Sequence, residues 1–223
     1  MKANIARSLR RRGARVRILP HTVTAAEALA SDVDGLVLSP GPGDPARLDG
    51  PVALARAAID DARPLLGICL GHQIVARAAG ADTRRLRFGH HGANHPVRDV
   101  DHGLVQVTAQ NHEVTVVGES LPAAGGFHVS QVNLNDDSVE GLRHRELPIE
   151  TVQYHPEGAP GPLDALAVFD RFMSAAVSHL AGSAGSAGSA GSTGGAGSTH
   201  VGGTHVGSAH VDGAFARGSE DRI

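Results

Sequence analysis

A change in composition at Ala181 limits how much of this 223-residue chain can form a core. From that residue onward the sequence is almost entirely Gly, Ala, Ser, Thr, His and Val, with repeated Ala-Gly-Ser units. The large apolar residues of this segment are Val201, Val206, Val211, Phe215 and Ile223. So few cannot offset the conformational entropy lost when such a segment is ordered. We therefore expect one folded domain over residues 1–180 and a low-complexity, disordered tail over residues 181–223.

Charge and hydropathy exclude several classes of protein. The formal net charge of −3 gives no basic field that would attract nucleic acid. No apolar run approaches the roughly 18 residues of a membrane helix. The three arginines at positions 10–12 are not joined to the apolar run of a secretory signal, and we interpret them as a solvated helix face rather than an organelle transit peptide. The single cysteine, Cys69, excludes an internal disulfide and favours the cytoplasm.

The first 90 residues alternate between strand and helix patterns. Short apolar runs bounded by Gly or Pro predict buried strands at residues 14–19, 35–39 and 64–69. Amphipathic or capped segments predict helices at residues 4–12, 24–30, 51–62 and 70–79, with Thr24 as an N-cap. This alternation is typical of an α/β fold with a largely parallel sheet.

The second half has more strand character. Strand patterns occur at residues 104–109, 127–132, 138–142 and 149–154, with turn residues between them. Residues 162–180 predict a final amphipathic helix. Its expected buried residues are Leu163, Leu166, Val168, Phe169, Phe172 and Val177. The sheet is therefore expected to be mixed, with helices on its flanks.

Histidines recur at five-residue spacing in the tail, at His200, His205 and His210. Spaced histidines can bind a metal ion. However, no carboxylate or cysteine partner stands at ligand spacing, and no rigid scaffold is expected there. We predict no metal site in the tail.

The strongest chemical signal is Gly67-Ile68-Cys69-Leu70-Gly71, between a predicted buried strand and a predicted helix. This arrangement has the form of a nucleophile elbow, in which flanking glycines avoid clashes at a tight turn. The thiol would lie at a helix N-terminus, where the dipole and free N–H groups favour the thiolate. A small buried apolar cysteine is the alternative. The glycines at a strand–helix junction favour the nucleophile.

A nucleophilic cysteine needs a base and a group that orients the base. The sequence Tyr154-His155-Pro156-Glu157 offers both, directly after a predicted strand. Extended geometry alone would point His155 and Glu157 to opposite sides, so a turn must bring the carboxylate to the imidazole. Spacing alone does not select His155 from the fourteen histidines of the chain.

The combination of GICLGHQ with a later QYHPE resembles the class I (triad) glutamine amidotransferase family, whose domain is flavodoxin-like. Within that family, the chain is most similar to the small subunits of carbamoyl-phosphate synthetases. The motifs that carry this similarity are LSPGPGDP at residues 38–45, FGHHGANHPV at 88–97, QNH at 110–112, NLND at 133–136 and VEGL at 139–142. They cover roughly residues 1–173 and occur in the family's order.

The resemblance implies a catalytic triad. Cys69 would attack the side-chain carboxamide of glutamine. His155 would take the thiol proton and give it to the leaving ammonia, and Glu157 would orient the imidazole.

The resemblance also implies substrate contacts. Backbone N–H groups of Leu70 and of the loop that contains Gly41 and Gly43 would hold the oxyanion. Gln73 and Asn111 would bind polar groups of the substrate.

In the family, ammonia passes to a large synthetase subunit, where ATP activates bicarbonate. This chain has no Walker-type phosphate loop, so we expect no cofactor on it, and ATP and Mg²⁺ on the partner. One alternative is the glutaminase of an anthranilate or aminodeoxychorismate synthase. A second alternative is a truncated, non-catalytic remnant.

Several features depart from the family pattern. The family's N-terminal domain and the first strand of its amidotransferase domain have no counterpart before Met1, so we expect a truncated or wrongly assigned start. Glu113-Val114 stands where the family usually has Gly and an aromatic residue, and Gln131 stands where it usually has His. A glutamate there would repel a substrate carboxylate unless it points away.

Overall fold

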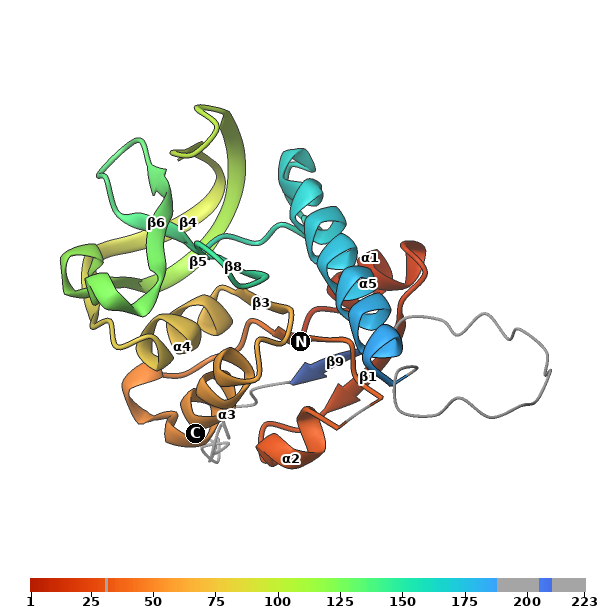
Figure 1. Ribbon diagram of the computed structural model, residues 1–223. Helices are drawn as coiled ribbons and strands as arrows, with labels where there is room; N and C mark the ends of the chain where they lie inside the picture. The colour runs from red at the N-terminus through yellow and green to blue at the C-terminus, as the bar shows by residue number, and fades with distance from the viewer. Residues whose placement is uncertain (31, 188–204, 210–223) are drawn as a thin grey trace, which may run out of the picture.

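The structure, a computed structural model, describes residues 1–30, 32–187 and 205–209. Within these residues the chain forms a mixed sheet in the order β1-β9-β2-β3-β8-β7-β6-β4-β5 (Figure 1). The strands are β1 (Arg15–Leu19), β2 (Gly35–Leu38), β3 (Leu65–Ile68), β4 (Thr83–Asp99), β5 (Val105–Val116), β6 (Phe127–Asn133), β7 (Val139–His144), β8 (Ile149–Val152) and β9 (His205–Ala209). The helices are α1 (Ala3–Arg11), α2 (Ala25–Ala28), α3 (Asp49–Asp60), α4 (Leu70–Ala78) and α5 (Ala167–Ala187), with short 3₁₀ turns at Pro45–Arg47, Gly118–Ser120, Ala123–Gly125 and Asp164–Leu166.

The sheet has a parallel half and an antiparallel half. Strands β1, β9, β2, β3 and β8 run parallel to one another. Strands β7, β6, β4 and β5 continue the sheet in antiparallel pairs. The predicted α/β class with a mixed, largely parallel sheet and flanking helices is therefore confirmed.

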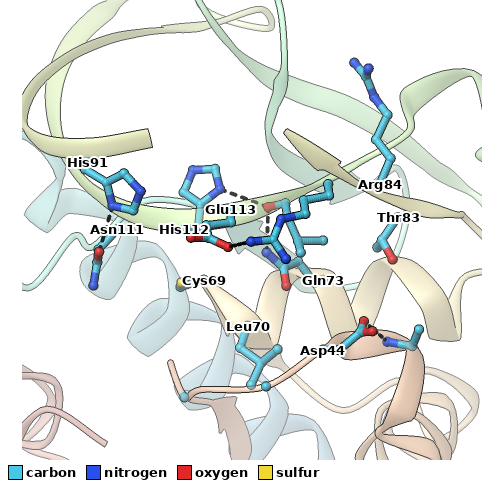
Figure 2. Close-up of a pocket in the computed structure, with 15 residues that line it drawn as sticks. Asp44, Cys69, Leu70, Gln73, Thr83, Arg84, His91, Asn111, His112 and Glu113 are labelled. Atoms are coloured by element: carbon cyan, nitrogen blue, oxygen red, sulfur yellow. Dashed lines mark hydrogen bonds and ion pairs between the residues drawn. The ribbon is translucent and has the colours of Figure 1, made fainter. Parts of the chain in front are cut away.

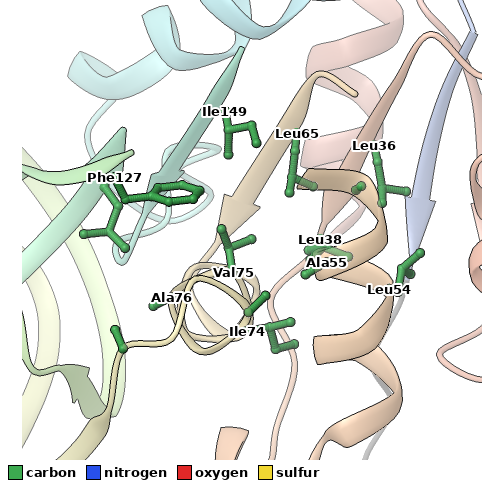
Figure 3. Close-up of a cluster of buried hydrophobic side chains, with 14 of the residues drawn as sticks. Leu36, Leu38, Leu54, Ala55, Leu65, Ile74, Val75, Ala76, Phe127 and Ile149 are labelled. Carbon is green, nitrogen blue, oxygen red and sulfur yellow. The ribbon is translucent and has the colours of Figure 1, made fainter. Parts of the chain in front are cut away.

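Alternating residues of the central strands divide the core between the two faces of the sheet. Leu36 and Leu38 of β2 pack in one cluster with α3 and α4 (Figure 3). Val37 lies in the other cluster, with apolar residues of α1 and α5. Both faces are covered, as expected for parallel strands that read as continuous apolar runs. Helix α4 is thereby fixed against the carboxyl ends of β2 and β3.

The strand β4 was not expected from the sequence. It contains Gly89 and Gly92 at positive φ and Pro96, which disturb the alternation typical of a strand. Its pairing with β5 shifts register twice along its length. Strand β5 is also longer than residues 104–109, because pairing with β4 extends it to Val116. These two strands bring residues 110–114 to the carboxyl end of β3.

The final helix differs from its prediction at both ends and in two buried positions. Helix α5 begins at Ala167, after the 3₁₀ turn, rather than at residue 162. Leu163 is 61% exposed because it precedes the helix, and Val177 is 50% exposed on its outer face. Val168, Phe169 and Phe172 are buried as predicted. Among the described residues no helix is long and apolar enough to cross a membrane.

Two parts of the tail differ from the expected disorder. Helix α5 continues through the first Ala-Gly-Ser units to Ala187. Residues 205–209 form β9, which lies between β1 and β2 and pairs in parallel with both. This pairing satisfies backbone groups of two strands that do not pair with each other. The remaining tail residues, including His200 and His210, lie outside the described residues.

Ending the chain after Ala187 is expected to lower the free energy of unfolding by roughly 1–2 kcal/mol, because β1 and β2 lose their shared ladder partner while five ordered residues are released. Urea denaturation measures the change. A chain that ends after Ala209 keeps β9 and is the matched control. Equal stability of the two truncated chains would mean that β9 contributes nothing to the sheet.

Candidate active site

Cys69 stands at the sharp turn between β3 and α4. Its backbone has φ 54° and ψ −105°, a conformation that costs a non-glycine residue about 1–3 kcal/mol. The backbone N–H of Cys69 donates to the carbonyl oxygen of Val152 at 2.8 Å, which ties the turn to β8. The side chain therefore stands at the N-terminus of α4, at the carboxyl edge of the parallel strands. The predicted elbow is present.

The flanking glycines are required by close packing rather than by flexibility. A Cβ at Gly71 would lie 2.0 Å from the carbonyl oxygen of Leu38, and one at Gly67 would lie 2.8 Å from the carbonyl oxygen of Gly71. Real Cβ atoms do not approach backbone oxygen atoms so closely. The Gly-x-Cys-x-Gly pattern thus allows α4 to pack directly against β2 and β3 next to Cys69.

His155 and Glu157 follow β8, the neighbour of β3. The N–H of His155 donates to the carbonyl oxygen of Ala109 in β5, and the imidazole Nδ1 donates to Glu157 Oε1 at 3.0 Å. Both side chains are buried. The turn that the sequence required does bring the carboxylate onto the imidazole. This leaves the other ring nitrogen, Nε2, available to Cys69.

The charges of these three residues are coupled. Burial disfavours the imidazolium, but hydrogen bonds to Cys69 and Glu157 outweigh it and raise the pKa of His155 to about 9. Burial also disfavours the Glu157 carboxylate, yet its hydrogen bond and attraction to His155 keep its pKa below the ordinary value. At neutral pH the imidazole is therefore charged, and the Glu157 carboxylate balances that charge.

Lys2 is a further partner of this group that the sequence did not indicate. Its Nζ lies 3.2 Å from Glu157 Oε1, the same oxygen that accepts from His155. Lys2 precedes α1 and is far from Glu157 in the sequence, so no local pattern indicated that the two side chains are in contact. The contact exists because α1 packs on the face of the sheet next to β8.

Replacing Lys2 by Met is expected to lower kcat/KM by about two- to fivefold, because Glu157 keeps His155 but loses a second positive neighbour. The effect is small because Lys2 is 42% exposed and a solvated ion pair contributes about 1 kcal/mol or less. Steady-state assays of the glutamine hydrolysis that the sequence resemblance implies measure it. Arg7→Met, on the same helix, is the control, because Arg7 contacts Asn4 and not Glu157. A loss of a thousandfold would contradict this minor role.

A cavity of about 620 Å³ opens in front of Cys69. The sequence-predicted contact residues Gly41, Gly43, Leu70, Gln73 and Asn111 all line it. Figure 2 shows Gln73 and Leu70 on α4, next to Cys69. The Gln73 amide donates to the carbonyl oxygen of Val114 at 2.9 Å and to Gln153 Oε1 at 3.0 Å, contacts that fix its orientation. The roles of these residues in substrate binding stay predictions.

The opposite wall of the cavity comes from β4 and β5. Asn111 Oδ1 accepts from His91 Nδ1 at 3.0 Å, so the amide is held at the rim. Glu113, the unexpected acidic residue, also lines the cavity and forms an ion pair with Arg85. Glu113 therefore does not simply point away, and its charge is balanced by a neighbour that sequence reasoning missed. A cross-strand pairing of this kind leaves no signal in the separate sequences of the two strands.

Among the described residues, His90, His112 and Glu140 form a buried group whose ligand atoms are close enough to hold a metal ion. However, Glu140 already accepts hydrogen bonds from Gln110 and Asn133, each at 2.8 Å. Its hydrogen bond to His90 raises the pKa of His90 against the effect of burial. The network joins Gln110 of β5 and Asn133 of β6 to Glu140 of β7, and so supports the strand that carries Asn111.

The elbow with its Cys, His and Glu defines a class of hydrolytic α/β domains, and comparison with known proteins identifies it. The family "Glutamine amidotransferase class-I" matches residues 1–175. The chain belongs to this family.

Among its relatives are several proteins named carbamoyl phosphate synthase small chain. The chain is 48% identical over 174 residues to the carbamoyl phosphate synthase small chain of Bacillus caldolyticus. The aligned region covers 78% of this chain and 47% of the relative. The chain is 49% identical over 173 residues to the protein of that name from Listeria monocytogenes, with 78% and 47% covered. The chain thus spans about half the length of these curated relatives. A solved structure, that of a putative GMP synthase protein from Thermoplasma acidophilum, matches with a TM-score of 0.67 and 26% identity, over 81% of this chain and 90% of the other.

Proposed function

We propose that this chain is the glutaminase part of a glutamine-hydrolysing carbamoyl-phosphate synthetase. The observation that carries the proposal is the coupled arrangement of Cys69, His155 and Glu157 at the elbow. The 48% identity to proteins named carbamoyl phosphate synthase small chain supports this synthetase over the anthranilate and aminodeoxychorismate types.

The first half of the reaction forms a thioester. The Cys69 thiolate attacks the carboxamide carbon of glutamine, and the carbonyl oxygen takes the negative charge. N–H groups at Leu70 and in the Gly41–Gly43 loop stabilise this oxyanion, each by on the order of 3 kcal/mol. The charged His155 gives its proton to the amide nitrogen, the C–N bond breaks and ammonia leaves.

The second half restores the enzyme. His155, now neutral, takes a proton from water, and the resulting hydroxide attacks the thioester carbon. The C–S bond breaks, glutamate leaves, and the thiolate and imidazolium are regenerated. Glu157 keeps the ring in place and stabilises its charged form throughout.

The ammonia would pass to a large synthetase subunit that holds ATP and Mg²⁺, so this chain itself would need no cofactor. We place the protein in the cytoplasm, where a catalytic thiol stays reduced.

The test is to incubate the purified chain with a diazo-ketone analogue of glutamine and to locate the adduct by mass spectrometry. Labelling at Cys69 is the expected result. When a large synthetase subunit is added, comparing glutamine-dependent with ammonia-dependent carbamoyl phosphate synthesis then tests the partner. Absence of labelling even with that subunit present would favour the non-catalytic remnant instead.

A further inference from the structure

The charged side chains around the cavity differ in what they contact. The cavity is lined by the charged residues Asp44, Arg84, Arg85 and Glu113. Asp44 accepts from the N–H of Ala46 at 2.9 Å and so caps its own loop. The Arg84 side chain extends away from Cys69 and Gln73 in Figure 2. Arg85 and Glu113 remain, and they pair with each other.

The two strands that carry this pair fix its place at the mouth of the cavity. Arg85 lies opposite Val114, the neighbour of Glu113, in the ladder between β4 and β5. The carbonyl oxygen of Val114 accepts from the Gln73 amide on α4, one turn after Cys69. The ion pair is therefore joined through one residue to the helix that presents the nucleophile. Its side chains are 76% and 53% exposed, so solvent reaches both.

An exposed ion pair of this kind contributes little to stability, about 0–1 kcal/mol, so separating the two side chains requires little free energy. A zwitterion that carries a carboxylate and an ammonium group on one carbon can bind both side chains at once. Its carboxylate takes the place of Glu113 on Arg85, and its ammonium group takes the place of Arg85 on Glu113. An arginine fork binds a carboxylate through two parallel N–H bonds, and a carboxylate accepts from an ammonium group.

The proposed substrate has this pattern of charge. When the carboxamide of glutamine reaches Cys69 at the base of the cavity, its two methylene groups leave the α-carboxylate and α-ammonium groups toward the mouth. Glu113 alone would repel the carboxylate, but next to Arg85 it meets the ammonium group while Arg85 meets the carboxylate.

We propose that the Arg85–Glu113 pair at the cavity mouth opens to bind the zwitterionic headgroup of the amino-acid substrate, Arg85 taking the α-carboxylate and Glu113 the α-ammonium group. This inference rests on the proposed glutaminase function for its choice of ligand. It makes both residues determinants of specificity rather than catalytic residues, because neither touches the reacting carboxamide.

The test measures protection of Cys69 from iodoacetamide, a neutral reagent whose approach does not depend on these charges. L-Glutamine is compared with glutaramate, which lacks the ammonium group, and with 4-aminobutanamide, which lacks the α-carboxylate. The wild-type chain is expected to be protected best by L-glutamine. Glu113→Gln should need about tenfold more glutamine for half-protection, with glutaramate unaffected. Arg85→Gln should need about tenfold more glutamine, with 4-aminobutanamide unaffected.

Arg84→Gln is the matched control, because it removes a neighbouring arginine of the same cavity without touching the pair. Its half-protecting concentrations should equal those of the wild type. Unchanged protection in both Glu113→Gln and Arg85→Gln would overturn the inference, and so would a wild-type chain that no α-amino acid protects. A chain that glutamine protects but that releases no glutamate would instead refute the glutaminase function, while the headgroup contacts would still stand.

Discussion

Replacing Cys69 by alanine is expected to abolish the proposed glutamine hydrolysis and to leave the fold in place. The loss in kcat should be on the order of 10⁴-fold or more, because no other group forms the covalent intermediate. The imidazole of His155 and the carboxylate of Glu157 remain, but they have no nucleophile to activate. Release of glutamate by the purified chain, measured against the wild type, gives the magnitude. In a complex with a large synthetase subunit, synthesis from free ammonia should be unaffected.

The strained backbone of Cys69 supplies the control for this variant. At φ 54° alanine keeps the strain, whereas glycine adopts that region without a steric penalty. Cys69→Gly should therefore be as inactive as Cys69→Ala but equally or more resistant to urea, because release of the strain offsets the greater freedom of the unfolded chain. Retained hydrolysis in either variant would mean that Cys69 is not the nucleophile.

Local sequence favoured Cys69 but offered His155 and Glu157 only as candidates, and the reason is the range of the contacts. The elbow is local, because Gly67 and Gly71 flank the cysteine in the sequence and in space. The approach of His155 to Cys69 depends instead on β3 pairing with β8, with Ile68 opposite Val152. Spacing along one chain carries no trace of that pairing, and only the resemblance to a family selected His155.

The same limit explains what was missed at the cavity. The Lys2–Glu157 and Arg85–Glu113 ion pairs each join elements that are distant in sequence. The strand β4 was missed for a different reason. Its glycines and proline interrupt the alternation of apolar and polar residues that predicts a strand, and the strand forms because it pairs with β5. The central strands were predictable because burial on both faces demands continuous apolar runs at residues 35–38 and 65–68.

Residues 205–209 of the tail show what an argument from composition leaves out. The composition of the tail predicted disorder because it has few large apolar side chains, and this reasoning considers side-chain burial only. Strand β9 is held by backbone pairing with β1 and β2, which needs no large side chain. Backbone hydrogen bonds offered by two neighbouring strands are a property of the fold, and composition does not report them.

Replacing Gly71 by alanine is expected to lower the free energy of unfolding by on the order of 3 kcal/mol or more. The added Cβ would lie 2.0 Å from the carbonyl oxygen of Leu38, which is fully buried in β2 and pairs with Gly67 of β3. Because the obstacle is backbone and not a flexible side chain, α4 must move away from the sheet. That movement separates Ile74 from the core and displaces Cys69 at the start of the helix.

The matched control is Gly50→Ala in α3, where a Cβ meets nothing within 4 Å. Alanine there should leave stability unchanged or raise it by up to about 1 kcal/mol, since it is the better helix former. Urea denaturation compares the two variants, and glutaminase assays below the unfolding transition follow the elbow. Gly71→Ala should lose activity where it is still folded, because the displaced helix N-terminus moves the thiol relative to His155. Equal stability and activity of the two variants would mean that α4 does not need to press on β2 to present Cys69.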